Sequence, residues 1–272
     1  MGLRVNTNVF SLGAQRNLNN VTSRLQGNFS RLSSGLRVAS AADDAAGLGI
    51  SERMRSQIRS FGAASRNAQD GISLAQTAEG ALNEVSANLT RMRELAVQAS
   101  NGTLNSTDRA TINTEFTALR TEIDRIADTT EFNGVSLLNG ASSSVSIQVG
   151  LDSGESISIS LQNTTDSTLG LSGLAADSTT NAQAALSALD TAINTVNTAR
   201  GNLGAAQNRL QSSFRSILSA RENLSASESR IRDVDVAEET ADLTRNSILQ
   251  QAATSVLAQA NVNPQLALSL IG

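Results

Sequence analysis

The sequence predicts a mainly α-helical protein: a long antiparallel helical bundle or coiled coil with one small β-hairpin region, and with its N- and C-terminal segments paired. Three observations predict this fold class. Aliphatic residues recur at helical spacing over two long stretches. A short stretch between them alternates with the two-residue period of a β-strand. The 272 residues include six Phe but no Trp and no Tyr, which favours slender packing by Leu, Ile, Val and Ala.

The two ends of the chain each carry an apolar stripe at helical spacing. Arg245 is the last charged residue, so the C-terminal stripe lies in a long neutral segment. Neither stripe can be buried by one helix alone. We therefore expect the two segments to pair antiparallel and another protein surface to cover their outer faces, the alternative being an autonomous pair whose tail folds onto itself. If other copies of the chain provide this cover, the residues that serve self-assembly are Leu18, Leu25, Phe29, Leu32, Leu249, Val256 and Leu257.

Two helices are predicted between residues 45 and 129. The first covers about residues 45–99, with charged residues around the rest of its cylinder. The stretch "SNGTLNSTD" interrupts the chain, and the second helix covers about residues 107–129. The first apolar stripe is Ile58, Phe61, Ser65, Ala68, Ile72, Ala75, Ala78, Leu82, Val85, Leu89, Met92 and Ala96. The second is Ile112, Phe116, Leu119, Ile123 and Ile126.

A change of pattern predicts a β-hairpin region at about residues 130–162. Aliphatic residues alternate with polar ones on both sides of "GLDSGE", and Asn-Gly pairs stand at 133–134 and 139–140. Alternation on both sides of a turn sequence is typical of two antiparallel strands. The alternating residues are Val145, Ile147 and Val149, then Ile157, Ile159 and Leu161.

The strongest repeat predicts a return helix that begins near Asn181. Aliphatic residues recur at intervals of seven, and small residues stand three positions after most of them. Such paired rows let a long helix lie close against another. The aliphatic row is Leu189, Val196, Leu203, Leu210, Ile217, Leu224 and Ile231. The small row is Ala192, Ala199, Ala206, Ser213, Ala220 and Ser227.

Breaks in both halves divide the chain into two domains, each discontinuous in sequence. "GLRVASAADDAAGLGIS" interrupts the front half and "IRDVDVAEETADLTR" the back half. A chain that goes out and returns brings these breaks side by side. We expect an inner coiled-coil domain of residues 1–44 and 234–272, which is the polymerisation domain if copies of the chain assemble, and an outer bundle of residues 45–233 that includes the hairpin region.

Composition speaks against several classes of function. Cys and His are absent, which removes disulfides, Cys/His metal sites and His-based catalytic arrangements. All basic residues are Arg, and the net charge of −4 gives no attraction to nucleic acid. The many amides of the neutral tail argue against a membrane span. We expect no enzyme activity, no catalytic residue, no metal and no cofactor.

The residues also resemble a known family, the bacterial flagellins. The N-terminal match includes "NTNVFSLGAQRNL", "LSSGLRVASAADDAAGLGIS", "AQDGISLAQTAEGALNEV" and "FNGVSLL". The C-terminal match includes "SRIRDVDVAEETADLTRNSILQQAATSVLAQAN" and "PQLALSL". Only a short stretch separates the hairpin region from the return helix, so the chain resembles a minimal flagellin without large outer variable domains.

The resemblance implies a structural subunit that self-assembles into the extracellular filament of the bacterial flagellum and serves swimming motility. It also implies unfolded passage through the flagellar type III export apparatus, an export chaperone, and contact with hook-associated junction and cap proteins. The alternative within the same class is a hook–filament junction protein.

A host innate receptor is a further partner that the resemblance suggests. In flagellins sensed by the flagellin-specific Toll-like receptor, an exposed arginine and leucine in the motif "LTRMRELAVQAS", with a glutamate on the next helix, contribute to the recognised surface. The matching positions are Arg91, Leu95 and Glu115, while Thr90 replaces the glutamine common in recognised members.

Overall fold

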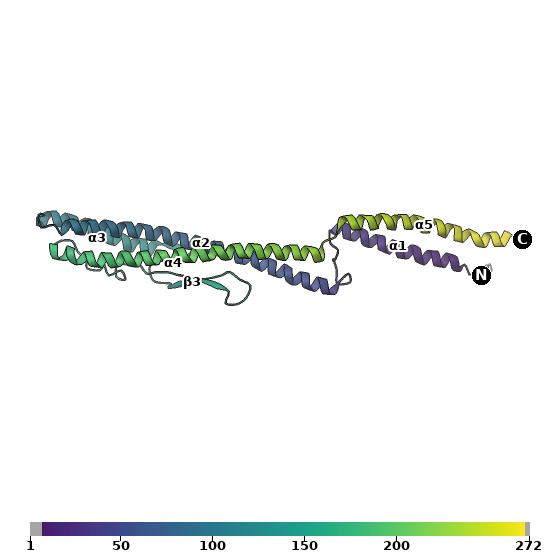
Figure 1. Cartoon of the computed structure of the whole chain (residues 1–272), viewed down its shortest axis with the longest axis horizontal. Helices are drawn as coiled ribbons and strands as arrows, with labels where there is room; N and C mark the ends of the chain where they lie inside the picture. The colour runs from purple at the N-terminus through teal and green to yellow at the C-terminus, as the bar shows by residue number, and fades with distance from the viewer. Residues whose placement is uncertain (1–6, 270–272) are drawn as a thin grey trace. The chain divides into compact units, whose positions relative to one another are not determined.

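The computed structural model describes the backbone of residues 7–269 and the side chains of residues 7–262. Its elements confirm the mainly α-helical prediction (Figure 1). The predicted helix starts near 107 and 181 lie one and two residues inside the observed helices. The elements are α1 (Val9–Ser34), α2 (Ala45–Ala99), α3 (Ser106–Thr129), β1 (Glu131–Phe132), β2 (Val135–Ser136), β3 (Ser144–Gln148), β4 (Ser156–Ser160), α4 (Thr179–Arg232) and α5 (Val236–Ser269).

The chain divides into two compact units, and each contains segments that are distant in sequence. The first consists of Met1–Ser56 and Asn223–Gly272, and the second of Gln57–Glu222. The divisions fall inside α2 and α4. The helix ends, by contrast, coincide with the sequence breaks near residues 44 and 234.

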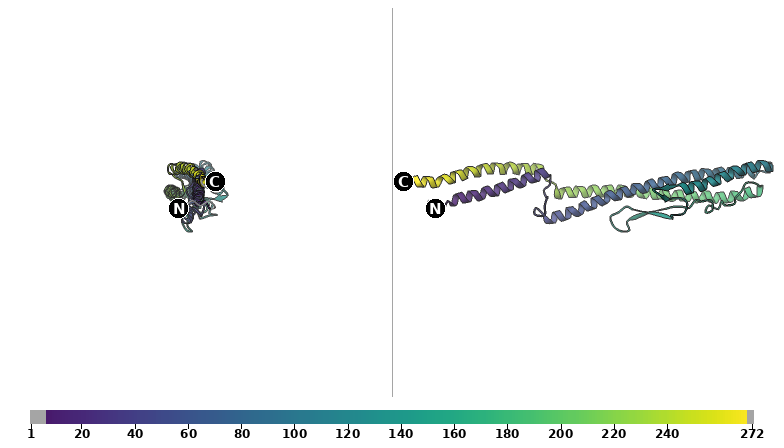
Figure 2. Two further views of the ribbon diagram at one scale, coloured as in Figure 1. Left: turned by 90° about the vertical axis from the view of Figure 1, so that its right-hand side faces the viewer. Right: turned by 180° about the vertical axis from the view of Figure 1, so that it is seen from behind.

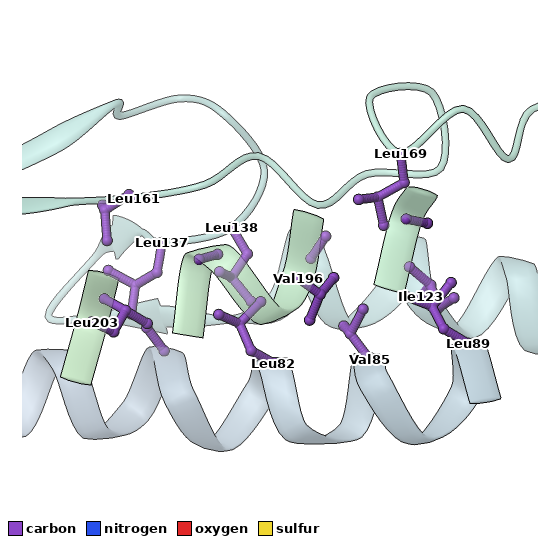
Figure 3. Close-up of a cluster of buried hydrophobic side chains, with 14 of the residues drawn as sticks. Leu82, Val85, Leu89, Ile123, Leu137, Leu138, Leu161, Leu169, Val196 and Leu203 are labelled. Atoms are coloured by element: carbon purple, nitrogen blue, oxygen red, sulfur yellow. The ribbon is translucent and has the colours of Figure 1, made fainter. Parts of the chain in front are cut away.

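The second unit has a long apolar core. Side chains of α2, α3 and α4 meet in it, joined by leucines from the loops beside the short strands (Figure 3). The predicted seven-residue row of α4 is buried from Leu189 to Ile217, and Leu224 and Ile231 beyond it are half-buried. The largest fully buried side chains are Phe116, Leu82, Leu89, Met92, Leu95, Ile123, Leu137, Leu138, Ile159, Leu171, Leu189 and Leu210.

The predicted hairpin region contains two antiparallel hairpins. The expected one pairs β3 with β4, with Val145 opposite Ile159 and Ile147 opposite Ile157. The isoleucines of β4 are buried and their neighbours exposed, so one face of this hairpin covers the helices. The other hairpin pairs β1 with β2. It turns at Asn133 and Gly134, whose φ angles of 49° and 77° are those that Asn-Gly turns favour.

In the first unit, α1 and α5 lie side by side and run antiparallel, as predicted (Figures 1 and 2). The α1 helix begins at an Asn8 cap, whose side chain accepts a hydrogen bond from the Ser11 backbone N–H. It ends at Gly35, whose φ of 71° is left-handed and lets its N–H bond the Arg31 carbonyl. Which face of each helix carries the large apolar residues determines whether this pair can bind other molecules.

The two sequence breaks lie side by side within this unit, as expected. The Val234 N–H donates to the Gly35 carbonyl, and the Arg37 N–H donates to the Arg232 carbonyl at 2.7 Å. The Val38 N–H also donates to the Arg232 carbonyl, and Val38 is 1% exposed. The joint segments are therefore held together by backbone hydrogen bonds.

Candidate assembly surface

The facing positions of α1 and α5 follow alternating three- and four-residue steps. This spacing is that of an antiparallel coiled-coil seam. Every seam residue is buried or half-buried. On α1 the seam is Ser11, Ala14, Leu18, Val21, Leu25, Asn28 and Leu32. On α5 it is Glu239, Leu243, Asn246, Gln250, Ala253, Leu257 and Ala260.

Polar side chains occupy four of the six buried seam positions, and Ala14 and Ala260 occupy the other two. Asn28 donates through Nδ2 to Glu239 Oε1 at 2.5 Å, and its Oδ1 accepts from Asn246 Nδ2 at 2.9 Å. Ser11 donates to Asn261 Oδ1 at 2.7 Å near the other end of the pair. Buried polar groups are costly unless they are hydrogen-bonded, and these contacts give the polar seam residues their partners. The seam is therefore closed without a large apolar core.

Large apolar side chains point away from this seam. Phe10 is 65% exposed, Phe29 56% and Val256 59%. The same outward exposure is found for Val9, Leu12, Ile248, Leu249 and Val262. Exposed apolar residues gathered on two neighbouring helices mark an interaction surface.

The predicted self-assembly residues divide between the seam and the outer surface. Leu18, Leu25, Leu32 and Leu257 are half-buried in the seam. Three others, Phe29, Leu249 and Val256, are exposed. The buried Asn28, Glu239 and Asn246 were not predicted, because the predicted stripes consist of apolar residues. Strict three-four spacing from Ser11 to Leu32 passes through Asn28, and this signal could have found it.

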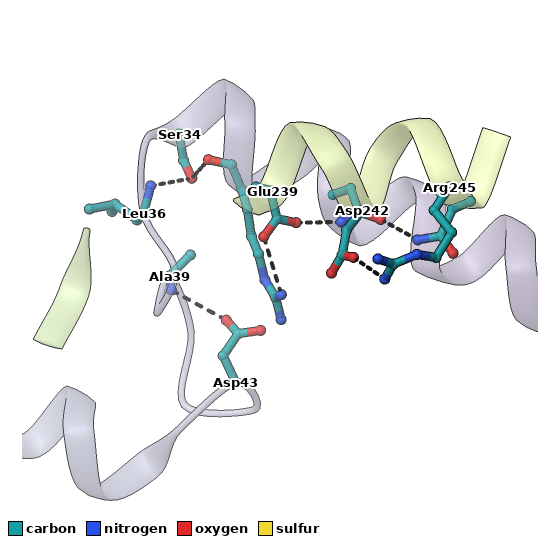
Figure 4. A network of polar contacts seen from close by, with 10 residues as sticks. Ser34, Leu36, Ala39, Asp43, Glu239, Asp242 and Arg245 are labelled. Atoms are coloured by element: carbon teal, nitrogen blue, oxygen red, sulfur yellow. Dashed lines mark hydrogen bonds and ion pairs between the residues drawn. The ribbon is translucent and has the colours of Figure 1, made fainter. Parts of the chain in front are cut away.

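Two carboxylates of the first unit, Asp43 (Figure 4) and Glu52, accept hydrogen bonds near the joint. Asp43 accepts hydrogen bonds from the Ser40 backbone N–H and hydroxyl, which hold the pKa of its carboxyl below the ordinary value. Glu52 accepts from Arg232 at 2.8 Å and from Arg55, and these contacts lower the pKa of Glu52. Both carboxylates therefore accept these hydrogen bonds most strongly when they are ionised.

Comparison with known proteins gives the family. Residues 5–143 match the N-terminal helical region of bacterial flagellin, and residues 186–271 match its C-terminal helical region. A flagellin of Halalkalibacterium halodurans is 50% identical over 98% of this chain and 99% of its own length. The chain belongs to the bacterial flagellin family.

Two further relatives agree with this assignment. A 33 kDa flagellar filament core protein of Treponema phagedenis is 42% identical over 98% of this flagellin and 99% of its own length. The crystal structure of Bacillus cereus flagellin superposes with a TM-score of 0.52 at 35% identity, and covers 60% of this chain and 94% of that one. The likeness therefore extends from sequence to fold.

The receptor-recognition candidates of this flagellin lie in the second unit. Arg91 donates through Nε to Glu115 Oε1 at 2.8 Å and through Nη1 to Glu94, and these bonds raise the pKa of Arg91. Leu95 is 1% exposed, so the expectation of an exposed leucine is wrong. The α2 helix packs in a core with both α3 and α4, and its buried face is wider than one stripe and includes Leu95.

The described residues of this flagellin contain no cluster of three or more Asp and Glu side chains that could hold a metal ion. None of the helices, over the same residues, has a stretch apolar enough to cross a membrane.

Proposed function

We propose that this flagellin polymerises into the helical filament of the bacterial flagellum, and that the outward apolar faces of α1 and α5 join neighbouring subunits. In this proposal residues 1–44 and 234–272 form the polymerisation domain, and residues 45–233 form the outer domain. The working protein is then extracellular and serves swimming. The observation that carries the proposal is the exposure of Phe10, Phe29 and Val256 beside a polar seam.

The energetics favour assembly over a solitary helical pair. Covering one large apolar side chain stabilises a contact by about 1.5–3 kcal/mol. The exposed residues of α1 and α5 therefore supply a substantial driving force when several are covered together. The absence of charge after Arg245 matters for the same reason, because a buried unpaired charge would oppose the contact.

The proposal requires a head-to-tail contact, in which the exposed face of one helix meets a different face on the next copy. Such a contact generates an open helical filament when it does not close into a ring. A structural role of this kind needs no catalytic site or cofactor.

Seeded growth tests the function directly. Short filament fragments are mixed with purified chain, and electron microscopy follows their length. We expect long filaments that grow at the ends of the seeds. Short assemblies of fixed length would instead favour a hook–filament junction protein, and no growth at high protein concentration would contradict the proposal.

A matched pair of variants tests the surface. Val256→Ser removes an outward side chain of α5, and Val97→Ser makes the same change at a residue of α2 that is 51% exposed. We expect Val256→Ser to raise the lowest concentration that supports growth at least about fivefold, because an apolar contact is lost. Val97→Ser should have a smaller effect. Equal effects would show that α5 is not the joining surface.

Recognition by the flagellin-sensing Toll-like receptor is a second proposal. It is supported by the exposure of Arg91 and Glu115 and by their position in the motif that resembles recognised flagellins. The two side chains already bond each other, so a receptor must accept the pair or replace its contact. Reporter cells given monomer and Arg91→Ala test this, and equal responses to both proteins would contradict a role for Arg91.

A further inference from the structure

The seam between α1 and α5 contains a buried polar cluster, which consists of Asn28, Glu239 and Asn246. Their exposed fractions are 7%, 8% and 8%. Asn28 lies between the other two, and Glu239 and Asn246 stand seven residues apart on α5. One residue of α1 thus bonds two successive seam positions of α5. Arg31 lies 3.8 Å from the other oxygen of Glu239.

Apolar packing alone gives this seam little preference for one axial register. Ala14 and Ala260 are the buried apolar residues among the described residues of α1 and α5. The seam leucines are half-buried and stand at intervals of seven on α1, at Leu18, Leu25 and Leu32, and of fourteen on α5, at Leu243 and Leu257. A slide of one heptad, which is two turns or about 10.5 Å, would bring like seam positions together. It would also move Asn28 from its place between Glu239 and Asn246, and leave at least one of these two buried side chains without its partner.

We infer that Asn28, Glu239 and Asn246 set the axial register of α1 against α5. The inference rests on the proposed function, because register matters through the surface that the two helices share. Phe29 stands on one helix and Val256 on the other, so a slide changes where they lie relative to each other. A neighbouring subunit fits only one such arrangement. The polar cluster is therefore a specificity-determining element of assembly.

Contacts at the other end of the pair agree with the same register. Asn8 donates through Nδ2 to the Ala260 carbonyl at 2.8 Å, and Ser11 bonds Asn261. Single polar residues at coiled-coil seams are known to select register at some loss of stability. Replacing bonded, buried polar residues by apolar ones is often neutral or stabilising, so such a cluster adds little to stability. A role in selecting the register fits this cluster better.

The absence of cysteine provides a clean measurement of register. Ser11→Cys with Asn261→Cys reports the observed register, since these side chains touch. Ser11→Cys with Ala253→Cys reports a slide of one heptad, about two turns, because residue 253 lies about 12 Å along the helix from residue 261. That separation is beyond the reach of a disulfide. Each pair is placed in the otherwise unchanged chain and in a triple variant, Asn28→Leu, Glu239→Leu and Asn246→Leu.

Cross-linking is measured in filaments that contain a small fraction of the cysteine-bearing chain in an excess of unchanged chain. The excess of unchanged chain then forms the filament even where the variant by itself would not polymerise. In the unchanged background we expect the 11/261 disulfide to form at least about tenfold faster than the 11/253 disulfide. In the triple variant that preference should fall to about twofold or less. Asn19→Leu, at an exposed position of α1, is the matched control and should keep the preference.

The outcomes separate the two proposals. A triple variant that keeps the full preference for 11/261 overturns the role of the cluster, even when filaments grow normally. Loss of the preference in Asn19→Leu as well would overturn it too, since the effect would follow any added leucine. Failure of the unchanged chain to extend seeds would instead contradict the proposed function.

Discussion

The α1–α5 pair and the bundle of α2, α3 and α4 distribute polar and apolar residues in opposite ways. The bundle buries Phe116 and a continuous set of leucines, and it pairs Arg93 with Asp190 in solvent at 2.7 Å. The terminal pair buries Asn28 and Asn246, and it exposes Phe10 and Phe29. Both regions are antiparallel helices built from similar residues. Helix pairing alone therefore does not make a stable unit, because stability depends on whether the apolar residues lie on the inward face.

This comparison predicts that the bundle folds by itself and that the terminal pair depends on neighbouring copies. Ordering a residue costs about 1–2 kcal/mol of backbone entropy. The narrow polar seam offers little apolar burial against that cost, whereas the bundle core offers much more. Each of the following experiments separates the two regions.

The largest expected effect comes from removing the tail after Asn246. The truncated chain loses the outward residues Ile248, Leu249 and Val256, so we expect no growth on seeds. The bundle should still unfold cooperatively, with its free energy of unfolding nearly unchanged. Electron microscopy and urea denaturation followed by circular dichroism measure the two results. Long filaments from the truncated chain would contradict the comparison.

Amide hydrogen exchange on the free monomer should show the next largest difference. Residues 10–35 and 248–270 should exchange at least about a hundredfold faster than the core of α2 and α4, because local opening of the pair costs little. Polymerisation should slow their exchange. Strong protection of both segments in the monomer would show that the pair is stable without neighbours.

Truncation of a core side chain should destabilise the bundle by a smaller but measurable amount. Leu210 is fully buried, and Leu210→Ala should lower the free energy of unfolding by about 2–5 kcal/mol through lost burial and a residual cavity. Leu218 on the same helix is 41% exposed, so Leu218→Ala should cost about 0.5 kcal/mol or less. Urea denaturation of the monomer compares them, and equal losses would contradict the assigned core.

The smallest effect concerns pH, and it arises in the bundle helices, since Glu52 lies on α2 and Asp190 on α4. The pKa of Glu52 is lowered mainly by its bond from Arg232, and the pKa of Asp190 by its bond from Arg93. A lowered folded-state pKa gives stability that is present above the ordinary values of 4.5 and 3.8 and is lost as pH falls through the folded-state pKa. Stability should therefore decline below about pH 4.5.

Between about pH 6 and 11 the urea midpoint should stay constant, apart from a small effect of the terminal amine. The chain has no His, Cys, Tyr or Lys, so no side chain titrates in that range. Glu52→Gln should weaken the decline in acid. A step in the midpoint near neutral pH would contradict this account.

The bundle shows how far sequence periodicity can lead. The seven-residue row from Leu189 to Ile217 predicted the buried face of α4, since large aliphatic residues dominate one side of that helix. The strands β3 and β4 followed from their alternation. Leu95 was misjudged, because a helix with two neighbours buries a wider arc than one stripe reveals.

The terminal pair shows where periodicity fails. Asn28 and Phe29 are adjacent, and an apolar stripe through Phe29 has nearly the same spacing as the seam through Asn28. Hydrophobicity favoured Phe29 as the inward residue. The structure turns Asn28 inward because Glu239 and Asn246, more than two hundred positions away in sequence, supply its hydrogen bonds.

The helices, the β-hairpin region, the pairing of the ends and the family could all be predicted from the amino-acid sequence. These follow from local spacing, turn residues and long ordered motifs, all of which can be read along one chain. The inward face of α1 and α5 was seen in the folded structure alone. That face also shows which residues stay exposed for contact with neighbouring subunits. The physical reason is that a buried polar side chain is stable only beside its partner, and the partner's position is a property of the folded chain.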